Sequence, residues 1–201
     1  MGYPSPVARL IEALKQLPGV GSRTAERHAF HLLRAPLKDV LELATAIEAI
    51  TTAVLSCSLC HNMSEADPCP ICSDDSREGQ RLLVVEQPRD LVAFEEAGWR
   101  GRYHVLLGHV SPLEGLEARD LTLDELASRV AAQGITEVVV ATNPDYEGDA
   151  TALHVSRALA DLEVSVTRIA RGVASGSAIE YSNAAMLSDA LAGRTQMDGP
   201  R

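Results

Sequence analysis

The chain has 201 residues, which is enough for one sizeable hydrophobic core or two smaller ones, and its formal net charge is −10. No apolar stretch approaches the ~20 residues of a membrane-spanning helix, so no membrane partner is expected. Aromatic residues make up only 3% of the chain, which argues against a nucleic-acid surface built on base stacking. Pro4 and Pro6 interrupt the N-terminus where a signal peptide would need an apolar run, and we therefore expect a cytoplasmic protein.

The charge is unevenly distributed along the chain. Residues 1–38 hold six basic residues against two acidic ones, a local net charge of +4, so the remaining 163 residues carry −14. A basic segment attached to an acidic chain indicates a local surface for a negatively charged partner such as nucleic acid. The alternative is that these charges only solvate the outer faces of helices.

We expect residues 1–56 to form a helical head. Apolar residues recur at helical spacing over residues 5–17, and the turn Pro18-Gly19-Val20-Gly21 then ends that helix. Ser22 is expected to cap a second helix, and a third helix is expected from about residue 38 to residue 55.

The turn between the first two helices, within the string LPGVGSRTAER, is the first candidate site. Gly19 and Gly21 allow a sharp bend and let a ligand approach the backbone closely. The next helix directs its free N–H groups and positive dipole end outward, and Arg23 and Arg27 add two charges on one helix face. The pattern predicts a helix–hairpin–helix that binds nucleic-acid backbones regardless of sequence. An ordinary helix–helix turn ended by glycine is the alternative.

The chain has four cysteines, which stand in two C-x₂-C turns within residues 57–72. Two such turns facing each other form a closed set of four thiolates, the ligand number and chemistry of a structural zinc site. We therefore expect one structural Zn²⁺ per chain, held by Cys57, Cys60, Cys69 and Cys72. With four protein ligands, no position stays open for catalysis. A pair of disulfides is the alternative, which a reducing cytosol disfavours.

After the cysteines the pattern changes to apolar, β-branched runs that alternate with helical stretches. This alternation predicts a mainly parallel α/β sheet covered on both faces, over residues 79–174. The expected strands are residues 82–86, 103–107, 137–141 and 165–170. Thr122 and Glu125 are expected to form a capping box for one of the helices, and the tail, residues 175–201, to hold a short helix near 183–191. The predicted fold class is thus multi-part, α+β with an α/β domain, in two bodies: a zinc-clipped helical head and the α/β domain.

Acidic residues follow two of the expected strands. Glu86 closes the first strand, and Glu147 and Asp149 follow the third. Ligand sites of open α/β sheets form beyond the carboxyl ends of the strands, so these three carboxylates could converge on a hard cation such as Mg²⁺. A glutamate on one strand with an acid-x-acid pair on another is the Toprim pattern of topoisomerases, primases and some nucleases. Acidic residues in loops and first helical turns are also common without a metal.

In this order, the hairpin, the cysteine module and the Toprim-like domain resemble the bacterial RecR family of recombination mediators. The resemblance covers essentially the whole chain and rests on LPGVGSRTAERHAFHLL, CPIC with the following SDDSR, VVEQPRDLVAFE, EGDATAL and IEYSNAAMLSDALAGR. It implies recombinational repair at single-strand gaps, where the protein, with RecO and in some settings RecF, helps to load RecA onto DNA. It also implies binding of single- and double-stranded DNA, and self-association into dimers or ring-like tetramers to which the tail contributes.

The resemblance assigns roles by position. It makes the four cysteines zinc ligands, Arg23 and Arg27 DNA contacts, and Glu86, Glu147 and Asp149 the Toprim acids. The chain departs from the family at three places. Arg23 stands where lysine is usual, which keeps the positive charge. Residues 173–177 replace a proline and a glycine pair, and Asn183 and Ala184 replace acidic residues, which bears on the tail contacts between subunits more than on the fold.

Two classes of function fit these residues. The first is a DNA-binding repair mediator, not an enzyme, in which the acids contact a basic partner protein. The second is a Mg²⁺-dependent Toprim nuclease, which would need only the metal and water. A topoisomerase is disfavoured because the chain is short and surrounds no tyrosine with a strand-passage module. We expect the first class, acting at the nucleoid.

Overall fold

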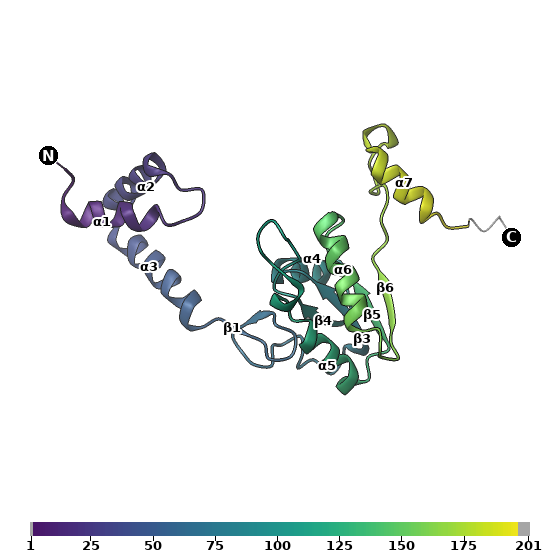
Figure 1. The fold of residues 1–201 in the computed structure, drawn as a ribbon. Coiled ribbons are helices and arrows are strands. Elements are labelled where there is room, and N and C mark those ends of the chain that lie inside the picture. The colour runs from purple at the N-terminus through teal and green to yellow at the C-terminus, as the bar shows by residue number, and fades with distance from the viewer. Residues whose placement is uncertain (1, 197–201) are drawn as a thin grey trace. The chain divides into compact units, whose positions relative to one another are not determined.

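The computed structural model describes residues 2–196, and they form two compact units. One unit ends at Val54 and the other begins at Leu55 (Figure 1), and each is described by itself. Among residues 2–196, no helix combines the length and the apolar character needed to cross a membrane. The order of elements confirms the predicted fold class: a helical hairpin, a four-cysteine module and a parallel α/β domain.

The N-terminal unit consists of three helices, α1 (Ser5–Leu14), α2 (Ser22–Arg34) and α3 (Leu37–Thr52). α1 and α2 pack against each other around Ile11, Ala25 and Ala29. The two alanines have small side chains, so the helices can approach closely. The predicted cap at Ser22 is wrong, because Gly21 occupies the capping position and no side chain caps α2.

α3 presents apolar residues to the surface of this unit. None of its residues is buried, and four large aliphatic side chains are each more than half exposed: Leu37, Leu41, Ile47 and Ile50. Aliphatic residues at helical spacing normally pack against a partner. These four side chains therefore lack a packing partner within the unit.

The C-terminal unit is built on a four-stranded parallel sheet in the order β4-β3-β5-β6. The strands are β3 (Glu78–Val85), β4 (Gly101–Val105), β5 (Glu137–Val140) and β6 (Ser165–Arg168). The helices are α4 (Pro88–Glu96), α5 (Leu123–Gln133) and α6 (Tyr146–Ala158), with a 3₁₀ turn, η1 (Ala118–Asp120), before α5. The predicted alternation of strands and helices is confirmed. α5 is followed by Gly134 in a left-handed conformation (φ 64°), which glycine adopts readily and which ends the helix.

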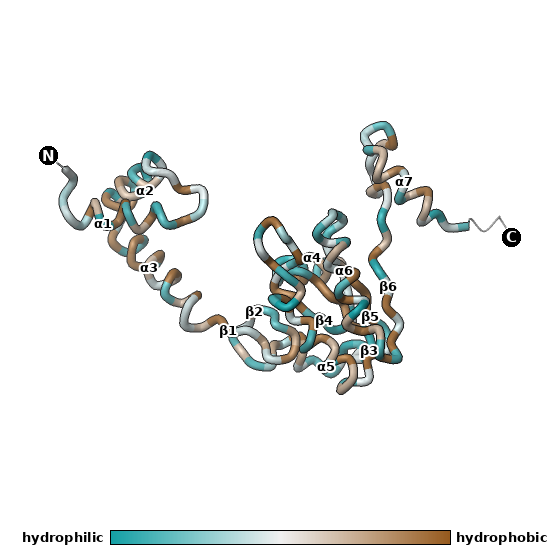
Figure 2. The backbone as a smooth tube through the Cα atoms, in the orientation of Figure 1, coloured by the Kyte–Doolittle hydropathy of each residue, from teal (hydrophilic) through white to brown (hydrophobic). Residues whose placement is uncertain are grey.

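Alternate residues of each strand enter two different cores. On β3, Leu82 and Val84 pack with α5 and α6, whereas Leu83 and Val85 pack with α4 on the opposite face. Figure 2 shows hydrophobic segments gathered between the helices of this unit. Because both faces of the two central strands are covered, residues 82–85 of β3 and 138–140 of β5 are continuous apolar runs in the sequence, whereas edge strand β6 is mostly exposed.

The predicted capping box at the start of α5 is wrong. Thr122 does precede the helix, but its side chain forms no cap. Its hydroxyl instead donates a hydrogen bond to Val105 O (2.9 Å) and lies 2.9 Å from His104 Nε2. Burial lowers the pKa of His104 to about 3, so the ring is uncharged at neutral pH. Thr122 therefore connects the start of α5 to strand β4.

The cysteine module packs with the α/β domain, so the predicted zinc-clipped head is wrong. The module contains a short antiparallel pair, β1 (Leu55–Ser56) and β2 (Met63–Ser64), and its Ile71 side chain contacts the core beneath α4. Val105 N on β4 donates a hydrogen bond to Cys60 O (2.8 Å). β4 is an edge strand whose outer backbone groups need partners, and the module supplies one of them.

The tail contains the predicted short helix. After β6 the chain forms a 3₁₀ turn, η2 (Ile179–Tyr181), and then α7 (Ala184–Ala192). Asn183 Oδ1 accepts a hydrogen bond from Met186 N (2.9 Å) and caps α7, so this departure from the family has a local structural role. The oligomer contacts assigned to the tail and the four domain boundaries stay predictions, and residues 197–201 lie outside the described residues.

Candidate DNA-binding hairpin, metal centre and acidic site

The turn between α1 and α2 places two glycines at the surface for different reasons. Gly19 has a φ of 77°, a left-handed conformation that favours glycine. Gly21 has an ordinary extended conformation (φ −79°, ψ 173°), and a Cβ added there would meet no heavy atom within 4 Å. Internal packing therefore does not require glycine at position 21. The missing side chain leaves the exposed backbone open to a ligand.

The start of α2 is an open, positively polarised helix end. No side chain caps its first N–H groups, and its first turn contains no acidic residue. Arg23 and Arg27 belong to the same helix, and neither forms an ion pair within the described part of the chain. The residues expected to contact DNA thus lie in the loop before α2 and in the first two turns of that helix, in an arrangement that suits a phosphate group.

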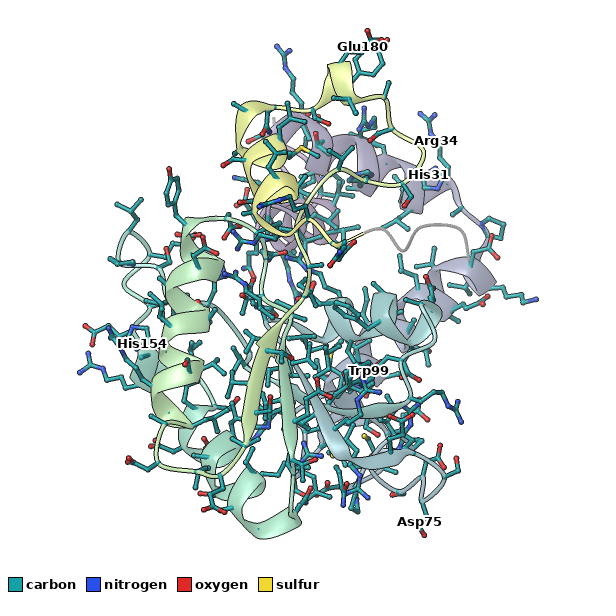
Figure 3. The ribbon with its side chains drawn as sticks, turned by 90° about the vertical axis from the view of Figure 1, so that its right-hand side faces the viewer. His31, Arg34, Asp75, Trp99, His154 and Glu180 are labelled. Carbon is teal, nitrogen blue, oxygen red and sulfur yellow. The ribbon has the colours of Figure 1, made fainter. Side chains whose placement is uncertain are left out.

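The C-terminal end of α2 also carries basic residues, and there they stabilise the helix. His31 and Arg34 occupy its last turn and lie next to each other (Figure 3). Cations at a helix C-terminus interact favourably with the helix dipole. Arg23 stands in the first turn, where a positive charge opposes the dipole. Its position costs helix stability and therefore favours a role in binding.

The four cysteine sulfur atoms form a compact, buried cluster, and all lie within 4.8 Å of one another. All four are free cysteines, so the disulfide alternative does not hold in this structure. Cys60 Sγ lies 3.5 Å from Cys69 Sγ, and Cys69 N donates a hydrogen bond to Cys57 Sγ (3.3 Å). Four soft ligands at this spacing fit a tetrahedral Zn²⁺, which would support the fold without binding a substrate.

Backbone bonds and one buried cation surround the cysteine cluster. Each C-x₂-C turn is closed by a hydrogen bond to the carbonyl of its first cysteine, of 2.9 and 3.0 Å. Arg129 of α5 places Nη2 3.8 Å from Cys72 Sγ. A side-chain hydrogen bond with Cys60, together with the charge of Arg129, lowers the pKa of Cys72 to about 5 although burial acts in the opposite direction. The same hydrogen bond raises the pKa of Cys60, and burial raises the pKa of Cys69, so the surroundings favour the thiolate at Cys72 and not at those two cysteines.

Glu86, the acid at the end of β3, is almost fully buried, with 2% of its surface exposed. Its two carboxylate oxygens accept hydrogen bonds from Asn143 N (2.9 Å) and Asn143 Nδ2 (2.6 Å). A buried carboxylate needs such donors to offset its lost hydration. Glu86 therefore joins the end of β3 to the loop that follows β5.

His109 stands between Glu86 and the second acid, Glu147. Its Nδ1 lies 3.7 Å from Glu86 Oε2, and its Nε2 lies 3.2 Å from Glu147 Oε2. Ser111 Oγ donates a hydrogen bond to Glu147 Oε1 (2.5 Å). The structure thus brings Glu86 and Glu147 to one imidazole. His109 and Ser111 were not among the predicted site residues, because no spacing rule connects this loop with the two strand ends.

Asp149 has a different set of partners. Its Oδ1 lies 2.6 Å from Arg168 Nη1, and it also forms an ion pair with Arg171. Hydrogen bonds from Arg171 and Arg168 hold the pKa of Asp149 below its usual range. Within residues 2–196, the four cysteines are the only group of three or more side chains whose potential metal ligands gather closely. The three acids do not converge in this way, contrary to the expectation of a common cation site.

The start of α6 explains this separation. The helix begins at Tyr146 because Asp145 caps it: Asp145 Oδ1 accepts a hydrogen bond from Gly148 N (2.7 Å). Glu147 and Asp149 therefore lie two positions apart in a helix, and such residues do not face each other. Glu147 contacts His109, whereas Asp149 pairs with Arg168 and Arg171.

The glycine between the two acids is required by close backbone packing. A Cβ added to Gly148 would lie 2.0 Å from Asn143 O, well inside van der Waals contact. We expect Gly148→Ala to lower the free energy of unfolding by about 3 kcal/mol, because backbone must shift to make room. Gly79→Ala is the matched control, since its Cβ would come no closer than 3.7 Å to a flexible arginine. Denaturant unfolding measures both, and equal stability of the two variants would contradict the prediction.

Known proteins match the same three parts of the chain. Residues 7–51 match the RecR helix-hairpin-helix model, residues 54–74 match the RecR zinc finger model with four cysteines, and residues 71–170 match the Toprim domain. The Recombination protein RecR of Rhodopirellula baltica is 46% identical over 197 residues, 98% of this chain and 99% of that protein. The proteins of that name from Pelotomaculum thermopropionicum and a Roseiflexus species are 50% and 49% identical, over 97% and 96% of this chain and 98% and 95% of theirs.

Proposed function

Because the chain belongs to the RecR family of recombination proteins, we propose that it is a DNA-binding mediator of recombinational repair without catalytic turnover of its own. In this proposal it acts with RecO, and in some settings RecF, to help load RecA onto DNA at single-strand gaps in the nucleoid. The observation that carries the proposal is the α1–α2 turn, where an uncapped helix start stands beside two arginines that form no ion pair among the described residues. Its proposed DNA contacts are Gly19, Gly21, Arg23 and Arg27.

A surface of this kind binds phosphate and does not read bases. Backbone N–H groups at a helix start and arginine side chains contact the phosphates of single- and double-stranded DNA alike. The few aromatic residues of the chain, 3% of the total, offer little for base stacking. Binding should therefore depend strongly on salt and weakly on sequence.

A reconstitution assay tests the mediator role. RecA filament formation would be followed on gapped DNA coated with single-strand-binding protein, with RecO, with this protein, and with both. We expect the pair to accelerate RecA loading beyond either protein alone, and a pair without effect would contradict the proposal. The same DNA incubated with Mg²⁺ or Mn²⁺ tests the nuclease alternative. A mobility shift without cleavage supports the mediator, whereas metal-dependent cleavage supports the nuclease.

Self-association is part of the proposal. The exposed aliphatic residues of α3 lack a partner within their unit, and Ile179, Tyr181 and Leu191 of the tail are also largely exposed. Covering such side chains against copies of the chain would gain ~25 cal/mol per Å² of apolar surface removed from water. We propose a dimer or a ring-like tetramer. Light scattering with and without DNA measures the mass, and a monomer at every concentration would contradict this part of the proposal.

We assign the acids to partner docking rather than to hydrolysis. Glu86 is buried and held by Asn143, so it supports the site from inside. The side chains of Glu147 and Asp149 are 41% and 44% exposed, so a partner protein can reach them. Acidic groups at a surface speed the encounter with a basic partner and select against acidic ones. Nothing in this role requires a bound Mg²⁺.

Amide substitutions separate docking from DNA binding. We expect Glu147→Gln with Asp149→Asn to slow RecO-dependent RecA loading about tenfold, because the negative charge of Glu147 is lost and Arg168 and Arg171, left without Asp149, repel a basic partner. Binding of bare DNA should stay near wild type, because the proposed DNA contacts lie in the other unit. Glu163→Gln is the matched control, since it removes an exposed charge beyond the other end of α6 in the same unit. The docking role would be contradicted if the control slowed RecA loading equally. It would also be contradicted if wild type cleaved DNA measurably and the double variant did not.

A further inference from the structure

Arg129 is a buried cation between strand β4 and the cysteine cluster. It lies on α5 and is 6% exposed. Its Nη1 donates a hydrogen bond to Tyr103 O (2.6 Å), and its Nε donates to Gln133 Oε1 (3.1 Å). Its Nη2 lies 3.8 Å from Cys72 Sγ. The carbonyl and the amide oxygen are uncharged. Of the three partners, only the sulfur can carry a negative charge.

A buried guanidinium normally has a carboxylate partner. Arg77, whose side chain is 7% exposed, pairs with Glu95 at 2.5 Å. Arg129 has no Asp or Glu oxygen within 4.0 Å among the described residues. Leaving a buried charge uncompensated is strongly destabilising. The anion that Arg129 faces must therefore come from the cysteines.

We propose that Arg129 is the counter-ion of the zinc–thiolate centre and couples zinc binding to the packing of α5 on β4. Four thiolates around one Zn²⁺ carry a net charge of about −2, so a nearby cation lowers the energy of the loaded site. The same guanidinium holds the backbone carbonyl of Tyr103 on β4, the edge strand that the cysteine module also contacts. This centre of charge about −2 exists only while zinc is bound, so loss of zinc weakens the charge pairing that offsets the burial of Arg129.

The coupling must act in both directions, because it is a free energy shared by two events. Zinc should stabilise the α/β domain more when Arg129 is present, and Arg129 should strengthen zinc binding by the same factor. A merely structural arginine would lower stability equally with and without zinc. The difference between the melting temperatures of the zinc-loaded and zinc-stripped protein therefore separates the two roles.

The first test uses the full chain with Arg129→Met, which keeps most of the side-chain volume and removes the charge. We expect this variant to lose zinc to a competing chelator about tenfold more readily, as for other residues that support metal ligands. We also expect a smaller difference in melting temperature between its loaded and stripped forms. Arg157→Met, which removes an exposed arginine of α6, is the control and should match the wild type in both measurements.

Gln133→Glu provides a second test that leaves Arg129 in place. Gln133 already accepts a hydrogen bond from Arg129 Nε, so a glutamate of nearly the same shape would give the guanidinium a carboxylate that does not depend on zinc. We expect the zinc-stripped form of this variant to melt at a higher temperature than stripped wild type. The difference in melting temperature between the zinc-loaded and zinc-stripped forms should therefore be smaller than in wild type. Unchanged zinc retention in Arg129→Met would overturn the proposal. If that variant does not fold, an unchanged difference in melting temperature between the loaded and stripped forms of Gln133→Glu would overturn it.

Discussion

Reversing both hairpin charges, Arg23→Glu with Arg27→Glu, is expected to abolish DNA binding while zinc content and thermal unfolding stay near wild type. Neither side chain forms an ion pair within residues 2–196, so their replacement breaks no internal charge pairing. The chain carries a net charge of −10, and the substitutions would remove the cations at its open helix end. Repulsion from phosphate would then oppose binding on every DNA sequence.

Single substitutions give a quantitative form of this prediction. Arg23→Ala and Arg27→Ala should each flatten the slope of log K against log salt by ~0.9 for duplex DNA, the contribution of one phosphate contact. Each should weaken binding equally on all sequences, because phosphate contacts carry no base information. Arg34→Ala, which removes the same charge from the other end of α2, is the control and should change the slope least. Normal binding by the double glutamate variant would show that the hairpin is only a structural turn.

Loss of zinc is expected to destabilise the α/β domain and to leave the helical head intact. Wild-type protein should contain about one Zn²⁺ per chain, and Cys60→Ser should lose it, because the four sulfurs act as one ligand set. The free energy of unfolding of the C-terminal unit should fall by more than about 4 kcal/mol, the range typical of a lost structural metal. Metal analysis of the purified proteins measures the first effect, and denaturant unfolding measures the second.

Hydrogen exchange locates the damage. Cys60 O accepts the hydrogen bond of Val105 N on edge strand β4, so the amides of β4 should exchange faster in Cys60→Ser. Amides of α2 belong to the other unit and serve as the internal control. Folded wild-type protein without zinc would contradict the metal assignment. Faster exchange in α2 with β4 unchanged would restore the zinc-clipped head that the sequence had suggested.

Short sequence patterns were sufficient to predict the features that depend on residues close together in the chain. The glycine turn between α1 and α2 follows from a short string, and the cysteine cluster follows from two C-x₂-C spacings. The alternation of strand-like and helical stretches predicted strands β3, β4, β5 and β6 and their parallel arrangement, and the apolar runs of β3 and β5 indicated burial on both faces. Ser22 does not cap α2 because Gly21 occupies the capping position, and Thr122 does not cap α5 because its hydroxyl donates to the carbonyl of Val105.

The tertiary structure alone decided which parts meet. The sequence could not show that the cysteine module covers the edge of β4, because an edge strand selects its partner in space and not by proximity along the chain. Nor could it show that Glu147 joins Glu86 at His109 while Asp149 turns to Arg168, because that depends on where α6 begins. Residue types at the right spacing determined the chemistry that each segment carries. Packing determined the neighbours, because burying a charge or a backbone group requires a partner from wherever the fold can supply one.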